Sequence, residues 1–320
     1  LLHEELLALL APAHRVPLED AALLPLAPAA QALVVTTDGF VVQPLVFPGG
    51  DLGKLAVCGT VNDLAMRGAR PLAVTVGLIL EEGLPLATLR RVVSSLSTTA
   101  AAVGVPVIAG DTKVVARGQA DGMFVSMTGV GTPVLTPPPS AGRARPGDQV
   151  VISGNIGDHG IAVLAARAEL GLAIGVHSDC APLWSLVATM VEAAGDDLHV
   201  LRDPTRGGVA AALNEIAEAS GVGIVLQEAS LPIAGGVRSA CELLGFDPLA
   251  LANEGKVLGF VAPGSASVLL AAMRRHPLGA ASEIIGEVIA TPAGRVVMET
   301  PLGVRRLVDM PTGELVPRIC

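Results

Sequence analysis

The chain has 320 residues, of which 51% are hydrophobic, and its 21 basic and 30 acidic residues give a formal net charge of −9. It has no tyrosine, one tryptophan and five phenylalanines, so the aromatic side chains on which single-stranded nucleic acid stacks are almost absent. No cluster of basic residues is present to bind a phosphate backbone, and we therefore do not expect nucleic acid as a partner.

The high apolar content raises the question of a membrane span, which needs about 20 apolar residues with few charges. The longest apolar run, residues 71–80, ends at Glu81, and the apolar segment 160–176 contains Arg167. The N-terminal sequence LLHEELLALL has acidic residues and no basic leader, unlike a signal peptide. We therefore expect a cytoplasmic protein without a membrane span.

In the first part of the chain, the pattern of apolar residues predicts strands near 33–36, 73–80, 105–108 and 123–130. Helices are predicted at 54–67 and 88–103, and the second has Leu89, Val92 and Leu96 at helical spacing. The stretch 137–148, PPPSAGRARPGD, is dense in residues that break regular structure. It is the expected boundary between two α/β halves.

A second α/β unit is predicted to begin at 149–153. A helix is predicted at 206–220, and strands are predicted near 223–227, 256–262, 284–289 and 295–299. From Met310 onward, prolines and a glycine leave few apolar anchors, so this segment is predicted to be a mobile tail.

Single aspartates stand beside small residues in several of these segments: Asp20, Asp38, Asp63, Asp111 and Asp203. Magnesium prefers hard oxygen ligands and is often shared between a few carboxylates and nucleotide phosphates. Taken one at a time, each aspartate is equally compatible with a helix cap or a turn. Their joint pattern favours a magnesium–nucleotide site.

The segment from Asp203 to Gly208, DPTRGG, precedes a predicted helix. Free amides at a helix N-terminus attract phosphate oxygens, the paired Gly207 and Gly208 would let a ligand approach, and Arg206 could bind a phosphate in bidentate fashion. The alternative is an ordinary helix with a glycine-rich start. The common phosphate-loop motif is absent, since Lys54 is followed by leucine rather than serine or threonine.

Two further residues are candidates for proton transfer. Glu254, in ANEGK, could act as a general base or simply belong to a turn. Lys113, in GDTK, lies between apolar segments, where partial burial would lower its pKa, although pairing with a nearby carboxylate is the more common role. His159 is more readily explained as a turn residue than as a catalyst.

The four cysteines, Cys58, Cys180, Cys241 and Cys320, lie far apart and form no CxxC pair, which argues against a zinc site or a disulfide framework. The first three lie in or beside apolar stretches and are expected to be inert core thiols. Cys320 is the last residue, so a thiol on a mobile tail could collect a group at one place and present it at another. The terminal carboxylate should raise the pKa of this thiol, and Arg318 should lower it.

These segments together resemble one family. The quoted matches are TTDGFVVQPLVFPGGDLGKLAVCGTVNDLAMRGARPL, ILEEG, GDTKVV, SGNIGDHG, RDPTRGGVAAALNEIA, ANEGK and the terminal PRIC, from about residue 18 to Cys320. They are similar to the HypE family of hydrogenase maturation carbamoyl dehydratases, of the aminoimidazole ribonucleotide synthetase and selenophosphate synthetase superfamily. The resemblance implies a two-domain α/β (α+β) fold with ATP bound between the domains.

The domains expected from the resemblance and the composition are an N-terminal ATP-binding domain at 1–142, which dimerises through its sheet, a C-terminal α/β domain at 143–309 and a flexible tail at 310–320. The resemblance further implies that a carbamoyltransferase, HypF, places a carbamoyl group on Cys320. ATP would phosphorylate the amide oxygen, and loss of phosphate would leave a thiocyanate. The cyanide would pass to the iron-carrying HypC–HypD scaffold for the nickel–iron hydrogenase.

The resemblance also implies the roles of individual residues. Cys320, Glu254 and Lys113 would be catalytic, the last two by handling the amide protons. Magnesium ligands would be Asp20, Asp38, Asp63 and Asp203. The residues expected to bind ATP are these four aspartates with Lys54, Asn62, Asp111, Thr112, Arg206, Gly207 and Gly208.

Two alternatives remain open at this point. One is a related ATP-dependent synthetase of the selenophosphate or aminoimidazole ribonucleotide type. Selenophosphate synthetases carry their reactive residue near the N-terminus, whereas the first cysteine here is Cys58. The other is a non-catalytic maturation scaffold, which would bind its partners but release no phosphate.

Overall fold

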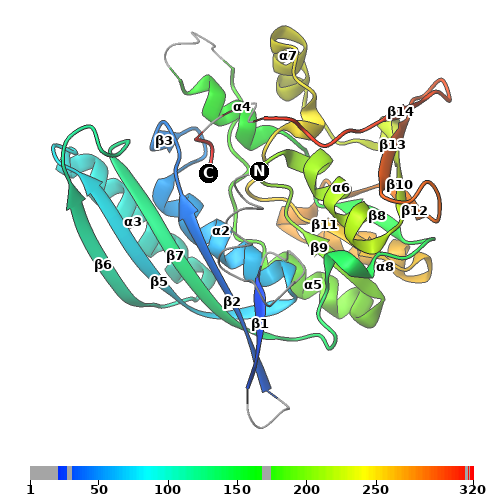
Figure 1. Ribbon diagram of the computed structural model, residues 1–320, viewed down its shortest axis with the longest axis horizontal. Helices are drawn as coiled ribbons and strands as arrows, with labels where there is room; N and C mark the ends of the chain where they lie inside the picture. Colours follow the sequence, from blue (N-terminus) through cyan, green and yellow to red (C-terminus); the bar gives the residue numbers. More distant parts are fainter. Residues whose placement is uncertain (1–20, 27–30, 168–173, 314–315, 317) are drawn as a thin grey trace, which may run out of the picture.

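The computed structural model describes residues 21–26, 31–167, 174–313, 316 and 318–320. Two β-sheets of different sizes lie side by side, each with its own helices, and the C-terminus of the chain lies between them beside helix α2 (Figure 1). Among the described residues, no helix is both long and apolar enough to cross a membrane.

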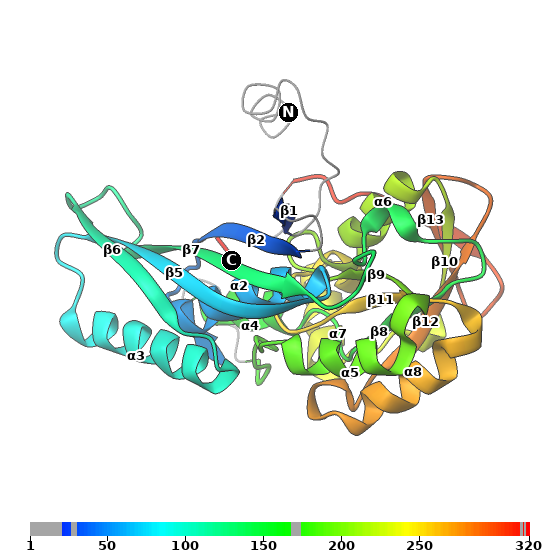
Figure 2. The same cartoon turned by 90° about the horizontal axis from the view of Figure 1, so that it is seen from below.

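The N-terminal sheet has five strands, mostly antiparallel. Their order is β1 (Ala22–Leu26), β2 (Gln31–Phe40), β7 (Met123–Pro133), β5 (Ala69–Glu81) and β6 (Val107–Val115), and only β5 and β6 are parallel neighbours. Helices α2 (Leu52–Met66) and α3 (Leu86–Val103) cover one face of this sheet (Figure 2). A small ribbon of β3 (Val46–Phe47) and β4 (Gly50–Asp51) precedes α2.

Helix α2 is buried along almost its whole length, because it packs between the sheet, α3 and the second domain. Its start is capped by the Asp51 carboxylate, which accepts the backbone N–H groups of Gly53 and Lys54 at 2.9 and 3.1 Å. At Gly53 an added Cβ would lie 2.0 Å from the carbonyl oxygen of Val92 in α3. Glycine is therefore required there for the two helices to approach.

The opposite face of the N-terminal sheet is not covered by any described helix (Figure 2). Strand β6 pairs only with β5, and its residues are exposed almost throughout. It carries large apolar side chains in water, including Ile108, which is 65% exposed. The strand is also longer than the predicted 105–108, because the GDTK segment continues the pairing with β5 instead of forming a turn.

The C-terminal sheet has seven strands. Their order is β14 (Arg305–Leu307), β13 (Arg295–Glu299), β10 (Gly223–Gln227), β12 (Glu283–Ile289), β8 (Gln149–Ile152), β11 (Leu258–Val261) and β9 (Leu198–Arg202). The pair β10–β13 is parallel and the other described pairs are antiparallel. The predicted strands of this half are all present.

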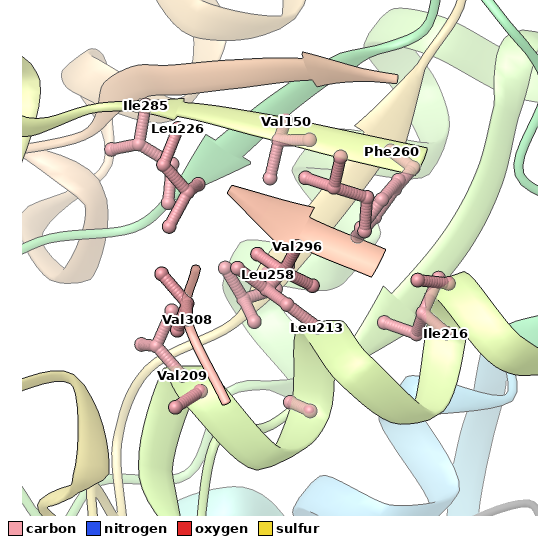
Figure 3. Packing of buried hydrophobic residues seen from close by; sticks show 14 of the residues in the cluster. Val150, Val209, Leu213, Ile216, Leu226, Leu258, Phe260, Ile285, Val296 and Val308 are labelled. Atoms are coloured by element: carbon pink, nitrogen blue, oxygen red, sulfur yellow. The ribbon is translucent and has the colours of Figure 1, made fainter. Parts of the chain in front are cut away.

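Alternate residues of the C-terminal strands face two different helical layers. On one side, Val150 and Phe260 pack with Val209 and Leu213 of α6 (Gly208–Ser220), as Figure 3 shows. On the other side, Val151 packs with α5 (Trp184–Ala194) and α8 (Pro263–Arg275). Two further helices, α4 (Asp158–Ala165) and α7 (Gly235–Leu244), contribute to a separate apolar cluster that includes Ile161 and Val237.

The described end of the tail packs against the N-terminal domain. Ile319 forms an antiparallel bridge with Val42, and the Gln43 N–H donates to the carbonyl oxygen of Arg318 at 3.0 Å. Val316 and Ile319 are buried in the apolar cluster that contains α2. This docking places the last residue of the chain at the junction of the two domains.

Candidate active site

The docked tail brings Cys320 to residues of the loop before α6 and of the segment before β11. The thiol is half-buried and packs against the core of the N-terminal domain. The Arg206 guanidinium donates a long hydrogen bond to its sulfur at 3.9 Å. Burial and the Glu254 carboxylate together raise the pKa of Cys320 to about 12, while Arg206 opposes this rise.

The positive charge beside the thiol was expected to come from Arg318, and that expectation is wrong. The Arg318 guanidinium pairs instead with Asp121 at 3.0 Å. Its backbone pairs with Gln43 in the bridge described above, so its side chain points to the surface of the N-terminal domain. Arg206, expected to bind phosphate, is the group that faces the sulfur.

Glu254 is the carboxylate with the most unusual surroundings. Its side chain is buried, and its Oε1 atom has no hydrogen-bond partner among the described residues. Burial raises the pKa of Glu254 well above its ordinary value, and nearby Cys180, Asp203, Asp179 and Asp38 raise it further. A buried carboxylate oxygen without a partner is costly, so its presence near a thiol points to a reactive site.

The backbone around Glu254 is held rigidly. The Asp179 carboxylate accepts the N–H groups of Glu254 and Gly255 at 3.1 and 3.2 Å and forms a buried ion pair with Lys256 at 3.0 Å. At Gly255 an added Cβ would lie 1.9 Å from the Asp179 carbonyl oxygen, so only glycine fits. Neither Asp179 nor Lys256 was singled out from the sequence, although Lys256 belongs to the quoted ANEGK segment.

Asn62 also holds this segment and is not free for a ligand. From the buried middle of α2, its amide nitrogen donates to the carbonyl oxygens of Ala181 and Glu254 at 3.2 and 3.4 Å. Its amide oxygen accepts the Leu183 N–H at 2.8 Å. Because its amide group is used by the backbone of the other domain, this arrangement argues against the expected ATP contact of Asn62.

Asp203 is a second buried carboxylate in the site. Burial, with a contribution from Asp38, raises its pKa to about 6 even though Arg202 acts in the opposite direction. Asp38 itself is exposed on β2 and accepts the N–H of Gly39 at 2.7 Å. Two carboxylates that disfavour each other's charge are suited to share a cation.

The expected magnesium ligands are only partly brought together. Asp63 lies on α2 and accepts a hydrogen bond from Thr36 of β2 at 2.7 Å, while Asp20 lies outside the described residues. Within the described ranges, no group of three or more His, Cys, Asp or Glu residues is arranged to hold a metal ion. Magnesium commonly takes one or two carboxylates together with nucleotide phosphates and water, so Asp38 and Asp203 suit that arrangement.

Three of the expected site residues lie on β6, away from the others. Asp111 and Lys113 form an ion pair at 2.7 Å, and their side chains are 68% and 70% exposed. Thr112 is exposed between them. Lys113 is therefore not partly buried, because β6 is an edge strand, and the alternative expectation, pairing with a nearby carboxylate, is the one observed. Lys54 is also engaged, since its ammonium group donates to the Gly49 carbonyl oxygen at 2.9 Å.

The glycine pair at the start of α6 serves protein packing. Gly207 and Gly208 both have positive φ angles, of 75° and 62°. At Gly208 an added Cβ would lie 2.5 Å from the carbonyl oxygens of Leu249 and Leu251, so the chain, rather than a ligand, makes the close approach. Gly207 and Arg206 nevertheless line a cavity of about 510 Å³, whose wall includes Val316 and Ile319 of the tail.

His159 was expected to be a turn residue, and it is instead fully buried in the first turn of α4. One ring nitrogen contacts Ser178 and the other contacts the backbone of Ile319, both at 2.8 Å. In the sequence, the only indication that His159 has a role was its place in the quoted SGNIGDHG segment. The remaining cysteines, Cys58, Cys180 and Cys241, are buried as predicted.

Comparison with known families and proteins shows what the chain is similar to. Residues 18–132 match the family described as AIR synthase related protein, N-terminal domain, and residues 145–299 match the corresponding C-terminal domain. The carbamoyl dehydratase HypE of Rhodobacter capsulatus is 51% identical over 291 residues, which is 90% of this chain and 84% of that protein. HypE of Escherichia coli K12 is 46% identical over 288 residues, again 90% of this chain and 84% of that protein.

Solved structures of HypE are also similar to this chain. The crystal structure of a HypE–HypF complex contains a chain with a TM-score of 0.90 and 46% identity, covering 97% of this chain and 99% of that one. HypE in complex with ATP has a TM-score of 0.87 and 45% identity, covering 99% and 96% of the two chains. A thiamine monophosphate kinase of Aquifex aeolicus, with a TM-score of 0.65, 20% identity and coverage of 94% and 100%, shares the fold.

The raised pKa of Asp203 predicts how stability depends on pH. Because the folded chain holds this proton up to about pH 6 and the unfolded chain releases it near 3.8, stability is lost as the pH rises between these values. Asp203→Asn should therefore raise the free energy of unfolding at pH 7.5 by about 2–3 kcal/mol and leave it nearly unchanged near pH 3. Urea unfolding at the two pH values measures this difference.

The exposed Asp309 provides the control, since Asp309→Asn should change the free energy of unfolding by less than about 0.5 kcal/mol at either pH. An Asp203→Asn variant that is no more stable than the wild-type chain at pH 7.5 would show that the ionised Asp203 carboxylate does not lower the stability of the folded chain.

Proposed function

The chain belongs to the HypE family of carbamoyl dehydratases, and we propose that it dehydrates a carbamoyl group carried on Cys320 to a thiocyanate at the expense of ATP. The observation that carries the proposal is the position of the Cys320 thiol near the buried Glu254 carboxylate, whose Oε1 atom has no hydrogen-bond partner among the described residues. The thiocyanate would supply the cyanide ligands of the nickel–iron hydrogenase.

The chemistry requires the amide to lose its oxygen and both N–H protons. ATP, when bound, supplies the phosphoryl group that turns the amide oxygen into a leaving group, with Mg²⁺ neutralising the phosphate charge. A base must then take the protons from nitrogen. Among the neighbouring side-chain carboxylates, Glu254 has the largest electrostatic effect on the pKa of the Cys320 thiol, and its Oε1 atom has no hydrogen-bond partner among the described residues. Its raised pKa makes it a stronger base than an ordinary carboxylate.

Arg206 has a complementary role. Its guanidinium lies at the sulfur, so it can donate to the carbamoyl oxygen attached there and steady it as negative charge develops. Asp38, Asp63 and Asp203 are the described candidates for holding Mg²⁺ with the phosphates, and Asp20 would join them. The cavity beside Arg206, about 510 Å³ in volume, falls in the size range of small-molecule sites.

The tail must leave this position for the carbamoyl group to be loaded. HypF is the partner expected to load it, and a homologous HypE has been solved in complex with HypF. We further propose that the cyanide passes to the HypC–HypD scaffold and that the chain works in the cytoplasm, where thiols stay reduced. Phosphate release that depends on the carbamoyl group separates this function from both alternatives, a related synthetase and a non-catalytic scaffold.

Dimerisation through the N-terminal sheet would give Lys113 a route to an active site. The open face and exposed β6 carry apolar side chains such as Ile108, which a second copy would cover. In such a dimer, Lys113 of one chain would act in the site of its partner. This proposal reconciles the expected role of Lys113 with its exposed position in one chain.

The first prediction concerns the nucleophile. Cys320→Ala should abolish loading, because no other described cysteine is exposed, while the fold and ATP binding remain intact. Incubation with HypF, carbamoyl phosphate and ATP, followed by mass spectrometry of the intact chain, measures the added carbamoyl mass. Cys241→Ala is the control and should load normally. Loading of the Cys320→Ala chain would remove Cys320 from its proposed role.

The second prediction concerns the base. Glu254→Gln keeps the approximate shape of the buried side chain but removes the carboxylate that would accept a proton. Dehydration of the preloaded chain should slow by at least about a hundredfold, so that the carbamoylated form accumulates. Glu228→Gln, at an exposed position, should dehydrate at the wild-type rate. A wild-type rate in the Glu254→Gln chain would exclude this carboxylate as the base.

The third prediction tests whether Lys113 acts across the dimer. Lys113→Ala and Glu254→Gln chains should each be inactive alone. If each site combines Glu254 of one chain with Lys113 of the other, random mixing should restore about a quarter of the wild-type activity, since half of the dimers are mixed and have one complete site. Mixtures that stay inactive although mixed dimers form would show that Lys113 does not act in the partner's site.

A further inference from the structure

His159 contacts the tail one residue before the reactive cysteine. Its Nε2 atom lies 2.8 Å from the carbonyl oxygen of Ile319, and its Nδ1 atom lies 2.8 Å from the Ser178 hydroxyl. The ring is fully buried and meets the ring of Phe47 edge-on, with 5.4 Å between the ring centroids. Its position thus bridges the C-terminal domain and the docked tail.

The helix that carries His159 is tied to the segment that carries Glu254. The Gly157 N–H donates to the Asn253 side chain at 2.7 Å, and the Gly160 N–H donates to the Ala252 carbonyl oxygen at 3.1 Å. His159 therefore holds a fixed position relative to Glu254. A bond from His159 to the tail fixes the thiol relative to the same carboxylate.

The hydrogen bonds define which nitrogen carries the proton. The Ile319 carbonyl oxygen can only accept, so Nε2 must donate. Burial lowers the pKa of His159 and favours the neutral ring, in which Nδ1 then accepts. Ser178 fits this assignment, because its oxygen accepts the Cys180 N–H at 3.1 Å and its own proton is directed to Nδ1.

We propose that His159 is a positioning residue that holds the end of the tail in the active site, through the bond from its Nε2–H to the Ile319 carbonyl oxygen. This rests on the proposed function, in which the tail alternates between the site and an external partner. When the tail leaves, the buried Nε2–H loses its acceptor, so the bond shifts the equilibrium toward the docked state.

The other polar contacts of the tail are less suited to this role. The Arg318–Asp121 pair is exposed on the Arg318 side, and such surface pairs contribute little. Arg167 donates to the Arg318 carbonyl oxygen over 3.4 Å, also near the surface. Burial of Val316 and Ile319 favours docking but does not by itself fix the direction of the next side chain. His159 binds the carbonyl group that directly precedes Cys320.

Two substitutions separate this role from simple packing. In His159→Asn, the amide group lies near the place of Nδ1, so it can bond Ser178 but does not reach Ile319. In His159→Gln, the longer side chain places a donor near Nε2, so the bond to the tail is retained. The two variants therefore differ in whether a donor to the Ile319 carbonyl oxygen is present.

The rate at which iodoacetamide alkylates Cys320 measures the undocked fraction of the tail. Measured by mass spectrometry on the full-length chain, it needs neither ATP nor HypF, so its outcome does not depend on the proposed reaction. His159→Asn should raise the rate on the order of tenfold or more, the effect expected when a buried donor loses its partner. His159→Gln should stay within about threefold of the wild-type rate.

The buried Cys58, Cys180 and Cys241 are internal controls, because they should remain unmodified if the variants are folded. On the preloaded chain, His159→Asn should also slow dehydration without slowing loading by HypF, and His159→Gln should restore the dehydration rate. Equal alkylation rates in the two folded variants, whether raised or unchanged, would overturn the proposal.

Discussion

A buried carboxylate with one unpartnered oxygen, close to a thiol at the junction of two domains, is the constraint on which the site depends. Among the described residues no ion pair offsets the cost of burying Glu254, and the nearby Lys256 pairs with Asp179 instead. Asp179 and Asn62 both hold the backbone of Glu254, one from the loop before α5 and the other from α2 in the first domain. The contact between the domains therefore keeps a base ready whose pKa is raised by its surroundings.

The tail has to satisfy two opposing requirements, since it must dock accurately and still leave. Docking is favoured by the burial of Val316 and Ile319 and by the bond to His159. It is opposed by the backbone of Arg318, whose φ angle of 55° lies in the left-handed region that costs a non-glycine residue about 1 kcal/mol. The wall of the cavity beside Arg206 is formed in part by the tail, so undocking would also open that cavity. Because these favourable and unfavourable free energies of docking offset one another in part, the tail can exchange between the docked and the undocked position.

The sequence allowed α2, α3, α6 and most strands of the two sheets to be predicted, because their apolar periodicity or length is distinct. The strands that were not predicted, β1, β3, β4, β9 and β14, are short or lie at a sheet edge. Helices α4, α5, α7 and α8 were missed; α5 is apolar on most sides, and none of the four begins with a side-chain cap. The resemblance grouped Cys320 and Glu254 with Lys113 as catalytic and assigned Arg206 to ATP binding. The positions of Arg206 and Glu254 near Cys320 depend on long-range docking that no local pattern encodes. The surroundings of Lys113 and Asn62 could not be predicted from the sequence. Lys113 is exposed because it lies on an edge strand, and the Asn62 amide group is hydrogen-bonded to the backbone of the other domain. His159 was missed because its acceptor lies 160 residues away along the chain.

The most direct test of this account is a crystal structure of the chain carbamoylated on Cys320, with Mg²⁺ and a non-hydrolysable ATP analogue. The account predicts that the tail is docked and that the carbamoyl nitrogen lies within about 2.6–3.2 Å of a Glu254 carboxylate oxygen, with the carbamoyl oxygen directed toward Arg206 and the phosphates. A docked tail whose carbamoyl nitrogen contacts other residues, with Glu254 out of reach of it, would contradict the assignment of Glu254 as the base.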